Sequence, residues 1–148
     1  MTMKMTTDRH IFWLAREIAI FGHEGQVDKL GRPYILHPQA VADAVPTTRQ
    51  KALAWVHDLV EDTPWTLEML LDAGFPQDFV DEVDALTHRK NEPREEYYAR
   101  VLEFADAQVV KRADVRHNLG RLDGLPAADQ DRLRAKYAKA LSILGEED

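Results

Sequence analysis

Apolar residues recur at helical spacing along nearly the whole chain, and this periodicity constrains the fold more than any other feature. The first example is the series Ile11, Leu14, Ile18 and Phe21. No segment shows the alternation with period two that is typical of a strand. Breaks rich in Gly and Pro separate the periodic segments, so we expect helices over about 8–22, 38–45, 48–60, 65–73, 79–86, 97–104, 106–119 and 127–144. The sequence therefore predicts an all-α bundle of about seven or eight helices.

The length and composition fit one folded unit. The chain has 148 residues, of which 45% are hydrophobic, enough to bury a core. No linker divides it, so we expect a single domain over residues 1–148, with 1–7 flexible. There is no cysteine, which excludes disulfides, thiolate zinc sites and cysteine nucleophiles and favours a reducing compartment.

Charge and hydropathy limit the partners. The formal net charge is −7, whereas a nucleic-acid binder usually presents a basic face. No apolar run approaches the roughly 20 residues that a membrane helix needs, and Met1 to Thr7 lacks the apolar stretch of a signal peptide. We therefore expect a cytoplasmic protein that binds neither nucleic acid nor membrane, and its oligomeric state stays open.

One apolar run, from Leu53 to Thr63, carries four ionisable residues. On a continuous helix His57 and Glu61 share one face, and Asp58 shares another with Asp62. Carboxylates enclosed among apolar neighbours are costly unless they are paired or bound to a cation. A metal would remove this cost, although a His-Asp pair also arises by chance on an ordinary solvated helix.

Two further segments add candidates. Asp114 follows an apolar start and stacks on Asn118 one turn later, although it could equally pair with Lys111 or Arg112 on the surface. His37 lies between an apolar stretch and a proline that suits a first helical turn. A capping or core histidine would explain it as well.

These motifs, taken together, resemble the hydrolase domain of the RelA/SpoT family, an HD-type phosphohydrolase. The resemblance rests on His23 to Gln26 (His-x-Gly-Gln), Lys29 to Pro38, His57 to Thr63 (His-Asp-x-x-Glu-Asp-Thr) and Ala113 to Asn118 (Ala-Asp-x-x-His-Asn), in that order. It covers about residues 11–144. Because we find no synthetase domain in the sequence, we expect the chain to resemble the small stand-alone alarmone hydrolases.

The resemblance implies an activity and a site. The activity is hydrolysis of guanosine tetra- or pentaphosphate to GDP or GTP and pyrophosphate, with a metal-activated water. The implied cofactor is Mn²⁺ held by His37, His57, Asp58 and Asp114. Mixed imidazole and carboxylate ligands would also suit iron, cobalt or zinc. By the same resemblance, Glu61 and Asp62 activate or orient the water, and Lys29, Tyr34 and Asn118 contact the nucleotide.

Three departures from the family pattern concern the substrate rather than the metal. Asp28 replaces a basic residue, Val115 replaces an arginine, and Arg121 replaces a threonine. Cations that could compensate are Arg32, Arg89, Lys90, Arg112 and Arg121. Two alternatives therefore stay open: an HD phosphohydrolase for another nucleotide (an adenosine alarmone, a nicotinamide dinucleotide phosphate or a nucleoside monophosphate), or a nucleotide-binding module without turnover.

Overall fold

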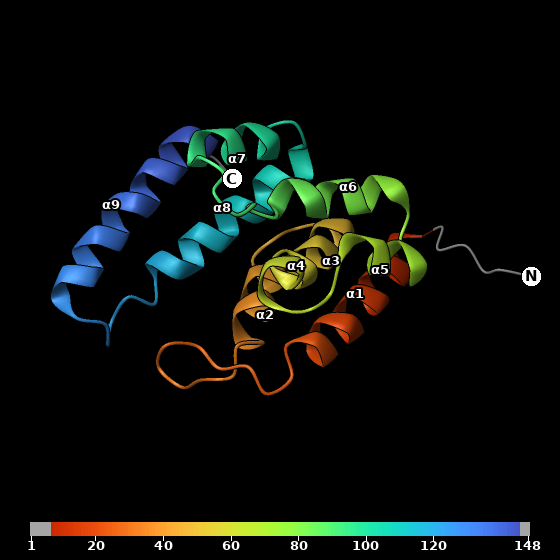
Figure 1. Ribbon diagram of the computed structural model, residues 1–148, viewed down its shortest axis with the longest axis horizontal. Helices are drawn as coiled ribbons and strands as arrows, with labels where there is room; N and C mark the ends of the chain where they lie inside the picture. The colour runs from red at the N-terminus through yellow and green to blue at the C-terminus, as the bar shows by residue number, and fades with distance from the viewer. Residues whose placement is uncertain (1–6, 146–148) are drawn as a thin grey trace, which may run out of the picture.

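The computed structural model describes residues 7–145, and the predicted all-helical architecture is confirmed over that range (Figure 1). The helices are α1 (Asp8–Gly22), α2 (Leu36–Asp43), α3 (Thr48–Val56), α4 (Leu59–Asp62), α5 (Leu67–Asp72), α6 (Gln77–Leu86), α7 (Arg94–Val101), α8 (Ala105–Leu119) and α9 (Ala127–Leu144). The expected flexibility of residues 1–7 falls outside the described residues, except at Thr7. The Thr7 hydroxyl caps α1 by accepting the His10 N–H at 3.2 Å.

Helix α3 is the centre of the bundle. The stretch from Ala52 to Val56 is buried at every position, because α1, α2, α6 and α8 all pack against α3. Leu53 and Val56 lie in one continuous apolar cluster with Phe79 of α6 and Val110 of α8. The residues that follow α3 are therefore held in the interior.

The predicted helix over 48–60 is wrong at His57 and Asp58, because α3 ends at Val56 and a separate helical turn, α4, begins at Leu59. The His57 Nδ1 lies 2.6 Å from the Ala54 carbonyl oxygen, the acceptor that the Asp58 N–H would use in a continued helix. His57 and Asp58 thus lie at a break in the helix. Asp58 and Asp62 still face the same way, since both contact the Tyr34 hydroxyl. The Glu61 carboxylate instead bonds to the backbone of His88.

Helix α5 is capped by Thr66, whose hydroxyl accepts the Met69 N–H. The Thr63 hydroxyl donates to the Leu59 carbonyl and accepts the Trp65 N–H. Asp106 lies inside the first turn of α8 and accepts a hydrogen bond from Gln50.

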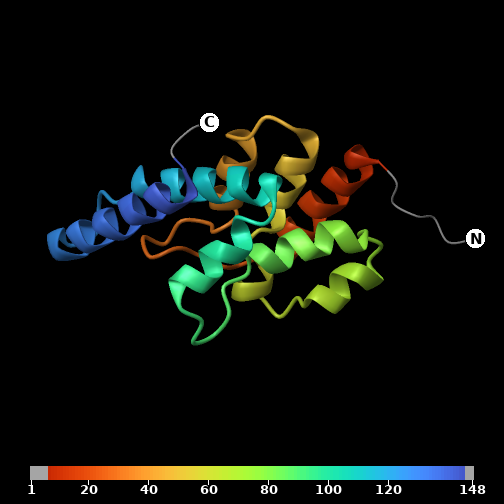
Figure 2. The same cartoon turned by 90° about the horizontal axis from the view of Figure 1, so that it is seen from above.

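Helices α8 and α9 pack side by side and extend away from α1 and α3 (Figures 1 and 2). The loop over residues 23–35 lies near the α8–α9 turn in both views. An isolated antiparallel bridge between Val27 and Pro33 gives this loop its shape. Among the described helices, none combines the length and apolar character needed to cross a membrane.

The N-terminus of α3 generates a stability prediction. Thr47 forms a capping box with Gln50, in which each side chain accepts the other residue's backbone N–H, at 3.1 and 3.3 Å. Thr47→Ala should lower the free energy of unfolding by about 1 kcal/mol, the usual value of a lost cap. Urea unfolding followed by circular dichroism measures this. Thr48→Ala, at the exposed next position, is the control, and equal losses in the two variants would contradict the capping role.

Candidate functional site

Three predicted metal residues meet at the break between α3 and α4. One side-chain ligand atom from each of His37, His57 and Asp58 lies within 4.8 Å of the other two. His37 comes from the first turn of α2, and all three residues are buried. A metal ion of ordinary coordination distance could be held by such a set.

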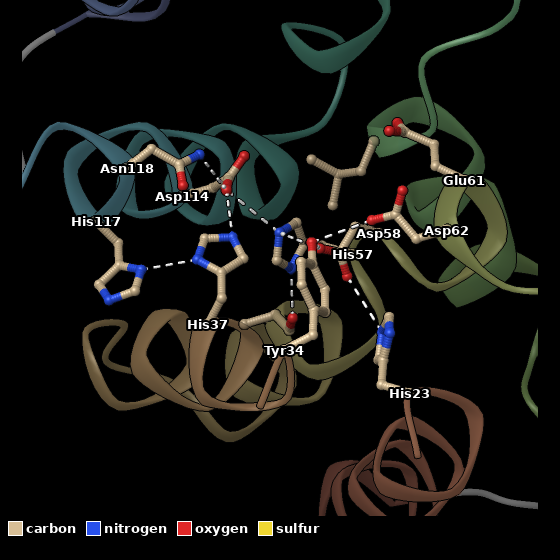
Figure 3. A network of polar contacts seen from close by, with 12 residues as sticks. His23, Tyr34, His37, His57, Asp58, Glu61, Asp62, Asp114, His117 and Asn118 are labelled. Atoms are coloured by element: carbon tan, nitrogen blue, oxygen red, sulfur yellow. Dashed lines mark hydrogen bonds and ion pairs between the residues drawn. The ribbon is translucent and has the colours of Figure 1, made fainter. Parts of the chain in front are cut away.

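Asp114 completes the group from α8. Its Oδ1 lies 2.8 Å from the His37 Nε2 and 3.4 Å from the His57 Nε2 (Figure 3). The side chain is buried, which excludes the surface ion pair considered above, although its Oδ2 does accept from the Lys111 ammonium at 2.9 Å. The four residues named from three separate segments therefore lie together, and their role as ligands is taken up as a proposal below.

The hydrogen bonding of His57 tests whether a cation fits. Its Nδ1 faces the Ala54 carbonyl oxygen, which can only accept, so Nδ1 carries the proton. In a neutral ring Nε2 is then a bare acceptor, and it faces Asp58 at 3.6 Å and Asp114 at 3.4 Å. Three acceptors aimed at one another need a proton or a metal ion between them. The chemistry of the donor set thus fits a divalent cation.

In the metal-free protein a proton would fill this place. Burial lowers the pKa of His57, but the negative charges of Asp58 and Asp114 outweigh it and raise the pKa to about 9. Burial raises the pKa of Asp58, yet His57 and the bonds from His23 and Tyr34 bring it down to about 2. Lys111 and the histidines likewise hold the pKa of the buried Asp114 well below its ordinary value. The centre is therefore built from ionised carboxylates.

Two histidines without a predicted role support the centre from outside. The His117 Nδ1 lies 2.7 Å from the His37 Nδ1, so one ring donates and the other accepts. His23 is 2% exposed, and its Nε2 faces the Asp58 Oδ1 at 3.5 Å while its Nδ1 contacts the Gln26 side chain at 2.8 Å. The sequence placed both residues in motifs, but no spacing rule pointed to these contacts.

Tyr34 connects the centre to the predicted catalytic carboxylates. Its hydroxyl contacts the Asp58 carboxylate and lies 3.1 Å from the Asp62 Oδ2. The Glu61 carboxylate instead accepts the backbone N–H of His88 and stands apart from the cluster in Figure 3. Partial burial raises the pKa of Glu61 and of Asp62, and the charge of Asp58 raises that of Asp62 further. Of the two, Asp62 lies in the network that contains the metal residues.

Two cavities open from the centre. A polar one of about 190 Å³ contains His37, His57, Asp58, Asp114 and Glu61 in its wall. A second one of about 300 Å³ is more apolar and contains the predicted substrate residue Lys29 together with several leucines. Both cavities share the side chains of Tyr34, Asp62, Asn118, Arg121 and Tyr137. All three predicted substrate residues therefore line space next to the centre.

Asp28 lines the second cavity at a position where the family pattern has a basic residue, and its carboxylate already has hydrogen-bond partners. Its carboxylate accepts the Leu30 and Arg32 backbone N–H groups and pairs with the Arg32 guanidinium at 3.0 Å. Backbone and side-chain bonds from Leu30 and Arg32 offset the desolvation of Asp28 and lower its pKa. Asp28 thus stabilises the 23–35 loop, and the Arg32 guanidinium compensates its negative charge.

The fold and the site together define an all-helical protein with a buried His/Asp centre suited to a divalent cation. No family model matches the chain. A solved structure described as a metazoan SpoT ortholog that hydrolyses ppGpp superposes with a TM-score of 0.76, covering 97% of this chain and 89% of its own, at 22% identity. This likeness shows that the two chains share a fold.

Proteins of similar sequence indicate the family to which the hydrolase-like fold belongs here. The chain is 37% identical over 124 residues to guanosine-3′,5′-bis(diphosphate) 3′-pyrophosphohydrolase of Haemophilus influenzae, covering 73% of this chain. It is 32% identical over 150 residues to the bifunctional (p)ppGpp synthase/hydrolase SpoT of Escherichia coli, covering 92% of this chain. The aligned regions span 18% and 21% of those two proteins. The predicted resemblance to the RelA/SpoT-type hydrolase domain is confirmed.

The raised pKa of His57 predicts how the stability of the metal-free protein depends on pH. The folded state holds a proton up to about pH 9, whereas the unfolded histidine releases it near its ordinary pKa of about 6.5. The stabilisation is complete below pH 6.5 and is lost as the pH rises to 9, and its full size is about 3 kcal/mol.

Urea unfolding in a chelator at pH 6.5, 7.5, 8.5 and 9 measures this loss. His37 and His117 have lowered pKa values, so they change stability mainly below this window. Burial lowers the pKa of His23, but its contacts with Asp58 and Gln26 raise it overall, so His23 adds to the loss. His57→Gln should make the profile shallower. Stability that stays constant or rises from pH 6.5 to 9 would contradict the proposed protonation of the centre.

Proposed function

We propose that this protein is a divalent-metal-dependent hydrolase that removes the 3′-pyrophosphate from guanosine tetra- and pentaphosphate. The observation that carries the proposal is the convergence of the His57, Asp58 and Asp114 acceptors at the floor of a polar cavity. The activities for which the relatives are named supply the substrate class. The second cavity, which is partly apolar, has room for a nucleoside beside the reacting phosphate.

His37, His57, Asp58 and Asp114 would hold the cation, and we propose manganese on the strength of the family resemblance. A bound divalent cation would supply a water of lowered pKa and offset charge on a phosphate oxygen. His57 is oriented for this task by the Ala54 carbonyl, and Asp114 by the Lys111 ammonium. Such outer contacts fix the direction of ligand side chains.

Asp62 and Glu61 are the proposed proton acceptors, with Asp62 favoured. Asp62 shares the Tyr34 hydroxyl with Asp58, whereas Glu61 is bonded to the chain at His88. Their raised pKa values suit a general base. Lys29, Tyr34 and Asn118 are proposed to contact the nucleotide, because each lines the cavity beside the centre.

The function is tested with purified protein loaded with Mn²⁺ and incubated with guanosine tetraphosphate. We expect stoichiometric GDP and pyrophosphate, and no activity after chelation. A parallel panel contains the adenosine counterpart, nicotinamide dinucleotide phosphate and nucleoside monophosphates. Orthophosphate release from a monoester, without pyrophosphate release from guanosine tetraphosphate, would contradict the proposal. It would indicate instead an HD phosphohydrolase that acts on another nucleotide. Tight nucleotide binding without any product would favour a binding module.

The assignment of the base makes a separate prediction. Asp62→Asn should keep the bound metal and lower kcat by roughly 100-fold or more, the usual scale of general-base loss. Glu61→Gln should have the smaller effect, because its carboxylate already bonds to the backbone of His88. Metal content and steady-state kinetics of the two variants are compared side by side. A larger loss of kcat in Glu61→Gln would reverse the assignment.

A further inference from the structure

Two of the three departures from the family pattern meet beside the second cavity. Asp28 stands where the pattern has a basic residue, and Arg121 stands where it has a threonine. The Asp28 Oδ2 lies 4.0 Å from the Arg121 Nη1, and both side chains line the second cavity. The Arg121 side chain is 24% exposed, so this cation is largely enclosed by the protein. The two departures therefore belong to one arrangement.

The Arg121 guanidinium is also directed at the side chain of Asn118. Its Nε and Nη2 donate to the Asn118 Oδ1, at 3.1 and 2.8 Å. A guanidinium has donors and no acceptor, so it bonds to the oxygen of this amide and not to its nitrogen. The Asn118 Nδ2 at the other end of the amide then faces the Asp114 Oδ1 at 3.3 Å (Figure 3). The two contacts require the same orientation of the amide.

The Asp114 oxygen in this series is the one that faces the metal residues. The Asp114 Oδ1 lies 2.8 Å from the His37 Nε2 and 3.4 Å from the His57 Nε2. If the Asn118 amide turned over, its oxygen would face the Asp114 carboxylate, and its N–H groups would face the guanidinium. Both contacts would then become repulsive. Arg121 thus opposes a rotation that would disturb Asp114.

The sequence suggested Arg121 only as a cation that could meet an anion. Its positive charge does reach the centre: burial lowers the pKa of His37, and the charges of His57 and Arg121 lower it further. A positive charge in this place would by itself weaken the binding of a divalent cation. The bonds to Asp28 and Asn118 indicate another use, in which the charge is partly offset and the donors fix an amide.

We propose that Arg121 is a positioning residue that acts on Asp114 through the Asn118 amide, and that Asp28 holds the guanidinium in place for this task. The series connects the 23–35 loop to a predicted metal residue of α8. Outer contacts of this kind fix the direction of ligand side chains and change metal affinity. The role of Asp114 as a ligand rests on the proposed function, whereas the orientation of the amide does not.

The first test uses the metal-free protein and ¹H–¹⁵N NMR. The side-chain NH₂ signals of Asn118 are assigned by their loss in Asn118→Ala. In Arg121→Met these protons should exchange with water roughly tenfold faster than in the wild type, the scale of one lost hydrogen bond. Arg132→Met removes the same charge from an exposed position of α9 and is the matched control, with no expected change. Circular dichroism verifies that each variant remains helical.

The second test is titration with Mn²⁺, with the free ion followed by electron paramagnetic resonance. Arg121→Met should weaken binding roughly tenfold, the lower end of the effect of outer contacts on metal affinity. Arg121→Lys can still donate to the same oxygen and should recover most of the affinity. The double variant Asn118→Ala/Arg121→Met should bind no more weakly than Asn118→Ala alone, because Arg121 acts through Asn118.

Unchanged Asn118 signals in Arg121→Met would overturn the positioning role, as would losses of Mn²⁺ affinity that add up in the double variant. Tighter Mn²⁺ binding by Arg121→Met would also overturn it, by showing that the guanidinium acts through its charge alone. A wild-type protein that binds no Mn²⁺ but shows the NMR difference would contradict only the proposed function, because the NMR comparison tests the amide without metal.

Discussion

The mutual approach of buried acceptor groups at His57, Asp58 and Asp114 is the constraint on which the rest of the structure depends. Ionised carboxylates and a bare imidazole nitrogen repel one another in a medium from which water is largely excluded, unless a positive charge lies between them. In the metal-free protein a proton on His57 supplies that charge, and its pKa is raised to about 9 accordingly. A divalent cation would supply it more completely, with His37 as a further ligand.

The fold is arranged to impose this approach. The second half of helix α3, Ala52 to Val56, is buried at every position. The helix ends where the Ala54 carbonyl faces the His57 ring nitrogen instead of the Asp58 N–H. The break turns Asp58 toward His23 and Tyr34 and directs α4 to the rim of the cavity. Helices α2 and α8 then contribute His37 and Asp114 from segments far apart in the chain. The same packing that stabilises the core thus positions the centre.

Local signals in the sequence were enough to predict most of the helices, because helical periodicity is a local feature. The four converging residues were predicted only from the ordered motifs that resemble the RelA/SpoT hydrolase domain. They failed at His57, where a side chain competes with the backbone for one carbonyl, since that competition depends on burial. They also could not indicate His23 or His117, whose contacts are made across the bundle. Asp28 looked unfavourable beside a nucleotide until its bonds to Arg32 became visible.

The polar cavity brings ionised carboxylates and basic side chains into one small space. Its carboxylates would attract a divalent cation. This attraction does not depend on the global charge of −7, because fields inside a cavity are dominated by the nearest groups.

The most direct test of the central claim is to titrate the metal-free protein with Mn²⁺ and follow the free ion by electron paramagnetic resonance. The account predicts one tightly bound Mn²⁺ per chain in the wild type and none in Asp58→Ala, with the helical circular dichroism of that variant retained. An unchanged Mn²⁺ count in Asp58→Ala, or no tight binding by the wild type, would contradict the existence of the centre.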